Sequence, residues 1–522
     1  LGAVAWIGAH PMRGPITWAR DRWRAVRGRS GASGLLANGS LYQSAGGGYR
    51  VRGWSAPSTG PTATIVRSGP ELRNRSRAEF RNNAWARSIA DVLVTNLTGT
   101  GFTPHPLFGS GDEGGAAERS AAWARDARNW WRRWGKRADA DGGCFEGILA
   151  TAVRGMVEAG DSFIVRAGGE SAGISLRLRV LEAEMVPLWK NETLGPQHVI
   201  RAGIEFLQGD VVAYWMYQEH PGEFTSGLSG STELRRVPAA QVLHLFRRLR
   251  PGQVRGEPWF ASVLLRLHDV GGYFDAECFR KKGAANFVFK CEAPDPDKVS
   301  DAIGEIHNAA AQDGETDTKP GSVVVTGVGE TFDLVQPADV GPNFTPFVTW
   351  VLREICAGPG VPYALATGDM SQETYTSHRA ALLEFWRKCD AIQYAAIVPI
   401  LNTLWAWWID ELAVSGVLPM PRFVAWREDY RDCEWVPPGR DWIDPAKEVA
   451  AKAEELALQI TSKTRICAAR GENFADLVHE LAEEKRLLEA AGLDAVLPER
   501  KPAAPARQAD KDPPVRRTGT DG

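Results

Sequence analysis

The sequence predicts an α+β protein that is mainly helical, and three observations support this fold class. Apolar residues recur with helical spacing over most of the chain, but alternate with polar residues between positions 174 and 248. The composition, with 44% hydrophobic and 24% charged residues, is typical of a globular protein and excludes a chain that is disordered or fibrous throughout. Twenty Trp among 522 residues indicate large buried or intersubunit surfaces.

The cysteines and the apolar stretches indicate a reducing compartment and no membrane segment. Seven Cys without any C-x-x-C pair fit neither a disulfide framework nor a zinc finger. The longest apolar stretch, 394–409, contains Pro399 and is shorter than the roughly 20 residues that a bilayer-spanning helix requires. We therefore predict no membrane contact, no metal and no other cofactor.

Charge is distributed unevenly along the chain. Residues 1–137 carry 21 Lys+Arg and 8 Asp+Glu, a net charge of +13, although the whole chain has a formal net charge of −3. Residues 1–70, in which Asp21 is the only acid, are predicted to be a disordered basic arm that is either solvated or in contact with nucleic acid or an acidic partner. Residues 291–340 carry eleven acids and two Lys. Separate basic and acidic zones suit an assembly whose surfaces meet different partners.

The N-terminal half is predicted to contain helices followed by a β-rich region. A capping-box pattern at Ser76-Arg77-Ala78-Glu79 predicts a helix start near residue 76, after order begins near Pro70, and Gly99 predicts its end. Short antiparallel strands with Gly and Pro between them are predicted over 174–248. The remaining elements expected here are helices over 117–137 and 143–158 and a strand over 161–166.

The C-terminal half returns to helical spacing. A helix over 258–285 ends in the basic cluster Arg280, Lys281 and Lys282. The helical pattern over 375–412 would be about 57 Å long at 1.5 Å per residue, and Pro399 is expected to kink it. The other elements expected are strands over 287–290, 322–325 and 332–335, helices over 297–312 and 343–356, and two or three charged helices over 444–495.

The sequence contains no recognisable catalytic or metal site. P-loop, G-x-S-x-G and H-E-x-x-H motifs are absent. Asp139-Ala140-Asp141-Gly142 resembles the start of a calcium loop, but its twelfth position is Ala150 instead of Glu, so a turn between helices is favoured. Glu182 and Glu184 would lie on opposite faces of a strand, which disfavours a shared metal. His244, within a strand pattern, is predicted to be a core or interface residue.

Several motifs, in order, resemble the lambda-type family of tailed-phage portal proteins, and the resemblance covers about 71–495. The most specific is Arg250-Pro251-Gly252-Gln253-Val254-Arg255-Gly256. At 374–377 the chain reads Thr-Tyr-Thr-Ser where the family has an Asn-Tyr-Ser-Ser pattern. Further matching residues are Arg81, Asn82 and Asn83, then Tyr375, Ser377 and Arg379, and finally Asp444 and Pro445.

The resemblance implies a closed ring, usually of twelve subunits, at one vertex of the capsid, through which double-stranded DNA is packaged and ejected. It implies no enzymatic activity. The partners implied are further copies of the chain, DNA, the terminase large subunit, head-completion or connector proteins, scaffold and the major capsid protein, with assembly in the host cytoplasm and a final place in the virion. The parts implied are a wing (71–257), stem helices (258–285 and 341–360), a clip (286–340), a tunnel loop with a long kinked helix (361–413), a link (414–443), a crown (444–497) and a disordered tail (498–522).

The tunnel loop is the part expected to face DNA. If Asp369 and Glu373 point into the channel, ring symmetry would stack them as acidic rings that repel phosphates and let the duplex slide. The alternative for Asp369 is a simple turn residue after Gly368. The loop residues named by the resemblance are Thr367, Gly368, Asp369, Met370, Ser371, Gln372 and Glu373.

Three other functions stay open at this point. A different capsid-associated ring or adaptor protein would share the same general features. A metal-dependent enzyme acting on DNA would use Asp139 and Asp141. A membrane-active channel would be built from 394–409.

Overall fold

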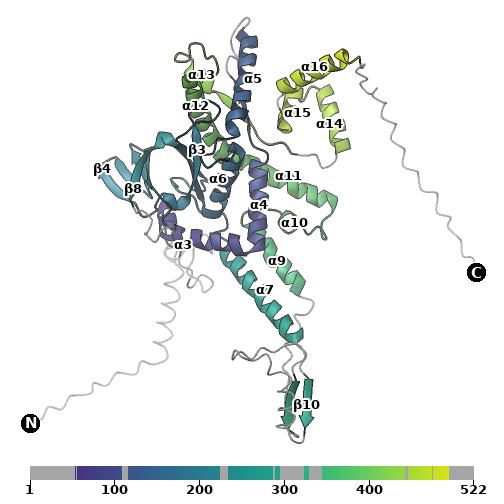
Figure 1. Ribbon diagram of the computed structural model, residues 1–522. Helices are drawn as coiled ribbons and strands as arrows, with labels where there is room; N and C mark the ends of the chain where they lie inside the picture. Colours follow the sequence, from purple (N-terminus) through teal and green to yellow (C-terminus); the bar gives the residue numbers. More distant parts are fainter. Residues whose placement is uncertain are drawn as a thin grey trace, which may run out of the picture. The chain divides into compact units, whose positions relative to one another are not determined.

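The computed structural model describes residues 53, 56–107, 116–223, 233–285, 289–293, 323–327, 344–440, 445–472 and 474–492. The chain forms two units, Leu1–Gly60 and Pro61–Gly522, and every element below belongs to the second. The described part is mainly helical with several small sheets, as predicted (Figure 1). The predicted helix over 297–312, the strand over 332–335 and the tail over 498–522 lie outside the described residues.

The first helix among the described residues, α3, spans Pro61–Asn82, so the predicted start at Ser76 and the boundary of the basic arm at residue 70 are wrong. Tertiary packing overrides the local capping signal here, because one face of α3 is buried along its whole length and favours a continuous helix. Ser76 belongs to that buried face and does not cap a helix. The buried residues are Ile65, Gly69, Arg73, Ser76 and Phe80.

The next helix, α4, spans Ala84–Thr98 and begins at a different cap. The Asn83 side chain accepts hydrogen bonds from the backbone N–H groups of Trp85 and Ala86 at 3.0 and 3.4 Å, which satisfies two of the unpaired donors of the first turn. Gly99 ends the helix with a φ of 46°, as predicted.

The core is built around indole rings from α5 (Ala116–Gly135) and α12 (Val398–Ser415). Trp131 contacts Trp134, Trp405 and Trp408 at ring-centroid distances of 4.7, 5.5 and 5.4 Å. Helix α6 (Phe145–Ala159) completes this core through Phe145, 5.2 Å from Trp131. Some of the Trp residues that were expected in buried or intersubunit surfaces are thus buried within a single chain.

The β-rich region forms two antiparallel sheets, as predicted. A three-stranded sheet has the order β3-β2-β9, and a five-stranded meander has the order β4-β5-β6-β7-β8. The strands are β2 (Asp161–Ala167), β3 (Arg177–Glu182), β4 (Glu192–Gly195), β5 (His198–Arg201), β6 (Ile204–Leu207), β7 (Asp210–Tyr217), β8 (Leu234–Pro238) and β9 (Val242–Phe246).

Two antiparallel helices, α7 (Leu264–Ala285) and α9 (Phe344–Ala357), lie side by side (Figure 1). The predicted start of the first at residue 258 is too early, because Trp259 donates its backbone N–H to Val157 of α6 at 3.1 Å and the chain turns before Leu264. Between the helices in sequence, β10 (Phe289–Ala293) and β11 (Val323–Gly327) pair in parallel.

The long helical stretch consists of two α-helices joined by one π-helical turn. Helix α11 spans Tyr375–Ile392, the π-turn η5 spans Gln393–Ile397, and Pro399 lies in the first turn of α12. Proline has no N–H and its ring crowds the preceding turn, so the irregularity expected at Pro399 takes the form of a π-turn. Gln393 also donates its side-chain amide to Leu97 O at 2.9 Å, which satisfies a carbonyl in the last turn of α4.

The C-terminal part contains three charged helices, as predicted over 444–495. They are α14 (Pro445–Ala457), α15 (Lys463–Ala469) and α16 (Phe474–Ala490). Before them, α13 (Arg427–Arg431) leads into β12 (Cys433–Val436), which pairs antiparallel with β1 (Thr103–Pro106).

One helical stretch among the described residues, Tyr375–Ser415, meets the length and apolarity of a membrane span. However, 56% of its most apolar window is buried inside the protein, and the core helix of a globular protein meets the same criteria. The stretch is therefore weak support for a membrane segment.

Candidate functional site

The predicted tunnel loop is an exposed turn between α10 (Tyr363–Thr367) and α11. Gly368 ends α10 in the left-handed conformation, with a φ of 73°, and donates its N–H to Ala364 O, as favoured at a helix C-terminus. At the other end, Thr374 and Ser377 form a reciprocal capping box that starts α11. Residues 368–372 are all exposed. The loop is thus held at both ends and uncovered in the middle.

The two acidic residues of this loop differ in environment. Asp369 is exposed, and hydrogen bonds from Ser371 and Tyr363 lower its pKa, so it is negatively charged at neutral pH. Glu373 is only partly exposed and lies 2.6 Å from Nδ1 of His378. Because the imidazole of His378 lies against Glu373, Asp369 is the more exposed acidic group of the loop, and Arg353 is the positive charge that acts on it.

The basic cluster at the end of α7 is partly compensated. Arg280 forms an ion pair with Glu277 at 2.6 Å, and Lys281 approaches the same carboxylate at 3.9 Å. Lys282, also exposed, completes the cluster. Because Glu277 is shared by two cations, the cluster is less positive than its sequence suggests.

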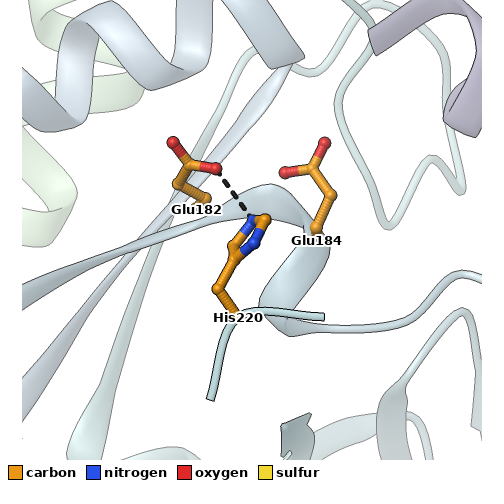
Figure 2. Close-up of side chains that lie close together, drawn as sticks. All are labelled: Glu182, Glu184 and His220. Carbon is orange, nitrogen blue, oxygen red and sulfur yellow. Dashed lines mark ion pairs between the residues drawn. The ribbon is translucent and has the colours of Figure 1, made fainter. Parts of the chain in front are cut away.

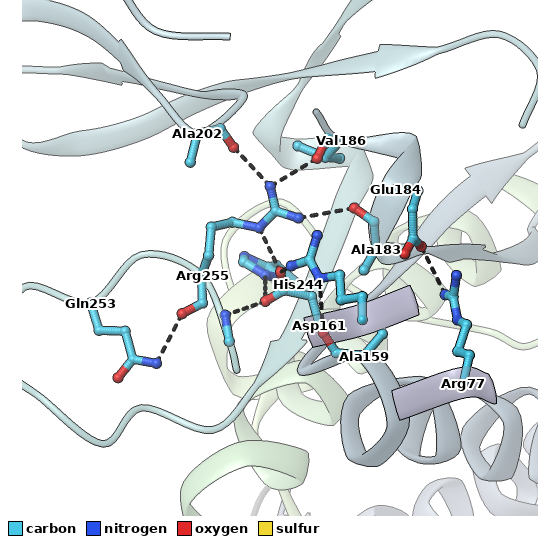
Figure 3. Close-up of polar contacts among 12 residues, drawn as sticks. Arg77, Ala159, Asp161, Ala183, Glu184, Val186, Ala202, His244, Gln253 and Arg255 are labelled. Atoms are coloured by element: carbon cyan, nitrogen blue, oxygen red, sulfur yellow. Dashed lines mark hydrogen bonds and ion pairs between the residues drawn. The ribbon is translucent and has the colours of Figure 1, made fainter. Parts of the chain in front are cut away.

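The most specific sequence motif, 250–256, is buried at Gln253, Arg255 and Gly256 and exposed at residues 250–252. Arg255 is completely buried and donates Nε to Asp161 Oδ2 at 2.6 Å (Figure 3). Its remaining N–H groups reach three backbone carbonyls, those of Ala183, Val186 and Ala202, at 2.8–2.9 Å. We call Asp161, Arg73, His244 and Arg255 the buried polar node. The node connects the two sheets and α3, so the buried part of this motif supports the fold.

Asp161 receives hydrogen bonds from every side of this node. Arg73 contacts Oδ2 at 2.6 Å, His244 Nε2 lies 3.1 Å from Oδ1, and Gly256 N also donates to Oδ1. Burial alone would raise the pKa of Asp161, but the charges of Arg255 and Arg73 and the hydrogen bond of His244 hold it well below its usual value. Burial lowers the pKa of His244, so a neutral imidazole donates to the carboxylate. His244 is a core residue, as predicted.

Acidification is expected to destabilise this region in two steps. Between pH 7.5 and 5.5 the unfolded chain takes up a proton at His244, near pH 6.5, that the folded state resists, so stability falls by at most about 1.4 kcal/mol per pH unit for that proton. The low pKa of Asp161 adds stability that is present above about pH 4 and lost only at lower pH. Urea unfolding of wild type and His244→Asn at both pH values tests the first step.

The variant His244→Asn should show a smaller loss of unfolding free energy between pH 7.5 and 5.5 than wild type. The exposed His268 provides the control, since His268→Asn should keep the wild-type loss. An unchanged loss in His244→Asn would contradict the assignment.

The other motif residues have mixed positions. Asn83 caps α4, whereas Arg81 and Asn82 are exposed. Gln253 accepts from the N–H groups of Leu249 and Arg250 and so shapes the turn that contains Pro251 and Gly252, whose φ is 73°. The remaining motif residues are Tyr375, which begins α11, Arg379, which pairs with Glu448 at 3.4 Å, Pro445, which begins α14, and Asp444, which lies outside the described residues.

The prediction that Glu182 and Glu184 lie on opposite faces is wrong, and residues two positions apart would share a face even within a regular strand. Strand β3 ends at Glu182 and the chain turns into a 3₁₀ helix (Ala183–Met185), so both carboxylates approach His220 (Figure 2). Arg77 pairs with Glu182 and Glu184 at 3.1 and 2.8 Å. The guanidinium of Arg77 thus already supplies the positive charge that pairs with both carboxylates, which disfavours a metal ion at this position.

The predicted turn at 139–142 is confirmed. Asp139 accepts the backbone N–H of Asp141 at 3.0 Å, and Asp141 pairs with Arg179 at 3.1 Å. Both carboxylates have partners within the chain, so the arrangement gives no support to a nuclease centre.

Sequence reasoning missed Asp161 and Arg73 as members of the polar node. Their contacts with Arg255 could not be predicted from local patterns, because these residues lie 94 and 182 positions before Arg255 in the sequence. A charged residue at the first position of an apolar strand, as at Asp161, is the only local hint.

Comparison with known proteins shows that the chain is similar to phage portal proteins. Similar proteins are the probable portal protein of Halomonas phage phiHAP-1 (24% identity over 82% of each chain) and portal protein B of Escherichia phage lambda (21% identity; 87% of this chain and 90% of that protein). A solved neck of a native GTA particle, computed with C12 symmetry, aligns over 85% of this chain and 99% of that one with 15% identity and a TM-score of 0.37. A sequence model of the phage portal proteins of the lambda family matches residues 47–393. The chain belongs to the lambda family of phage portal proteins.

Proposed function

We propose that twelve copies of the chain close into a ring at one vertex of the capsid, and that double-stranded DNA passes through this ring during packaging and ejection. The observation that carries the proposal is the loop 368–373. It is uncovered on the subunit, held at both ends by helix caps, and bears the exposed carboxylate of Asp369. The ring acts as a conduit, and the chain itself performs no reaction.

The charge of the loop suits a sliding contact. Twelve copies of Asp369 around the bore present a ring of negative charge, which DNA phosphates do not bind, whereas Lys or Arg in this position would release counterions and hold the duplex. Glu373 contributes less to this ring, because His378 lies against it.

The remaining parts take the places that the family arrangement gives them. Helices α7 and α9 form the stem, 286–340 the clip, 71–257 the wing and 444–497 the crown. By the family resemblance the terminase large subunit docks on the clip, and the alternative role for its acidic segment (a net charge of −9 over 291–340) is to bind head-completion proteins. Scaffold and the major capsid protein contact the ring during assembly in the host cytoplasm, and the finished ring stays in the virion.

Deletion of 368–373 tests the role of the loop. We expect rings to assemble, because these residues make few contacts outside the loop, but packaged genomes to be shorter or poorly retained. The measurement is packaged genome length by pulsed-field electrophoresis of DNA from purified particles. Full-length packaging with normal retention would remove this role.

A charge reversal provides a finer test. Asp369→Lys should slow or stall packaging, since twelve added cations in the bore attract phosphates. The matched control is Asp210→Lys, an equal change at an exposed residue of β7, which should package normally. If both variants behave alike, the charge of the loop does not matter.

A further inference from the structure

Two adjacent glycines occupy the middle of α7, and one of them has no explanation within the subunit. Glycine is the least favourable helix-interior residue after proline. At Gly272 an added Cβ would meet nothing within 4 Å, whereas at Gly271 it would approach the Asn83 amide at 3.9 Å. Gly272 is exposed, so nothing in the described part of the chain requires a residue without a side chain there.

Gly272 lies on an apolar stripe that faces away from the rest of the subunit. Leu265, Gly272, Ala276 and Phe279 follow one another at intervals of 7, 4 and 3 residues, which places them on one helix face. Leu265 is 72% and Phe279 is 80% exposed. The opposite face of α7 is the buried one and includes Leu267 and Val270. We call the four exposed residues Leu265, Gly272, Ala276 and Phe279 the α7 outer stripe. Its two large side chains, at the ends, flank a shallow depression at the two small residues.

The neighbouring helix α9 also exposes large aromatic side chains. Trp350 is 68% and Phe347 is 52% exposed. The two helices are aligned by Arg266, 3.6 Å from Glu354, and by Tyr273, whose ring lies 5.9 Å from that of Phe344. Along the antiparallel pair, Trp350 therefore lies at the level between residues 266 and 273 of α7.

We infer that Trp350 of one subunit packs over Gly272 on the α7 outer stripe of the next subunit. The inference rests on the proposed ring. Rotation about a ring axis keeps every residue at the same height, so with this helix pair running along the axis, the neighbour's Trp350 arrives at the level of Gly272. The indole occupies the space between Leu265 and Phe279 that the missing side chain of Gly272 leaves open. This contact explains why a glycine is present at position 272. The contact joins two different surfaces, as a closed head-to-tail ring requires.

Charge also matches across this contact. Asp269 lies beside the α7 outer stripe and has no ion-pair partner among the described residues. Arg353, exposed and one turn from Trp350, lies at nearly the same level on α9, and its guanidinium lies 5.5 Å from the ring centroid of Tyr363 in its own subunit. Opposite charges at the rim of an apolar contact fix its register more than they strengthen it. The occupant that fits the stripe is therefore a second copy of this chain.

The test uses Gly272→Leu in the full chain. The open space at this position lets the subunit accept the side chain, and Leu is a better helix former, so thermal unfolding of the subunit should not shift downward. Ring formation should fall at least about tenfold, because the added side chain displaces the neighbour's indole. Native mass spectrometry and negative-stain electron microscopy measure the ring fraction. Trp350→Ala, which removes the indole from the other side, should give the same loss.

The matched control is Cys278→Leu, the same residue placed at an exposed position of α7 that is turned by at least about 100° from every member of the stripe, which should leave the ring fraction unchanged. Rings at the wild-type level in both Gly272→Leu and Trp350→Ala would overturn this contact while leaving the ring itself intact. An equal loss in Cys278→Leu would also overturn it. A wild-type chain that forms no ring would instead overturn the proposed function.

Discussion

Replacement of Arg255 by Met should destabilise the subunit by about 3–5 kcal/mol, a large part of the roughly 5–15 kcal/mol that stabilises a typical protein. The guanidinium is fully buried and makes four hydrogen bonds, to Asp161 and to three carbonyls. Methionine fills a similar volume but leaves those acceptors without a donor and Asp161 with less positive charge around it. Unpaired buried polar groups lose the full cost of their desolvation. Urea unfolding followed by tryptophan fluorescence measures the loss.

The control for this variant is Arg236→Met. Arg236 also binds a carboxylate with two hydrogen bonds, to Glu205 at 2.8 and 3.0 Å, but its side chain is 47% exposed. Water can replace what the guanidinium provided, so we expect a loss of about 1 kcal/mol or less. An unfolding free energy of Arg255→Met within 1 kcal/mol of wild type would contradict the role of the node.

Gly256→Ala should be nearly as severe, for a steric reason. An added Cβ at this position would lie 1.9 Å from Gly160 O and 2.5 Å from Gly160 C. Both are backbone atoms, and the segment cannot retreat, because Gly256 N donates to Asp161. We expect at least about 3 kcal/mol of destabilisation, measured as a lower urea midpoint or as a loss of soluble protein.

Gly→Ala substitutions at two other positions serve as controls for this steric destabilisation. Gly168→Ala meets nothing within 4 Å and has no positive φ, so it should be neutral. Gly252→Ala also has open space but a φ of 73°, so it should cost about 1–2 kcal/mol from backbone strain alone. If Gly256→Ala unfolds at the same midpoint as Gly168→Ala, the close approach of the two backbones is not rigid.

The same residues explain why a family motif can be specific without forming a surface site. Gln253, Arg255 and Gly256 hold a turn against strand β2 through side-chain and backbone contacts. The residues that we propose for the channel, such as Asp369, make mostly local hydrogen bonds. Sequence resemblance thus pointed to both regions, and burial distinguishes the residues that support the fold from the exposed residues that we propose for contact with DNA.

Local patterns predicted elements whose ends are set by nearby residues. Helix α4 stops at Gly99 and the strands of the β-rich region fall where alternation predicts them, because a cap or a two-residue period depends on neighbours in the chain. The start of α3 was predicted wrongly, since the buried face that extends it to Pro61 packs against residues far away in sequence. The turn that joins Glu182 to Glu184 was missed for the same reason.

The amino-acid sequence by itself determined the fold class, the order of the helices and strands, and the family, because these depend on periodicity and on motifs read in order. Only the tertiary structure decided which charges are buried partners and which remain free. It paired Arg255 with Asp161, 94 residues away in the chain, and Glu373 with His378, and it left Asp369 and Gly272 exposed. The physical reason is that burial and ion pairing depend on distances in space, which sequence spacing does not report.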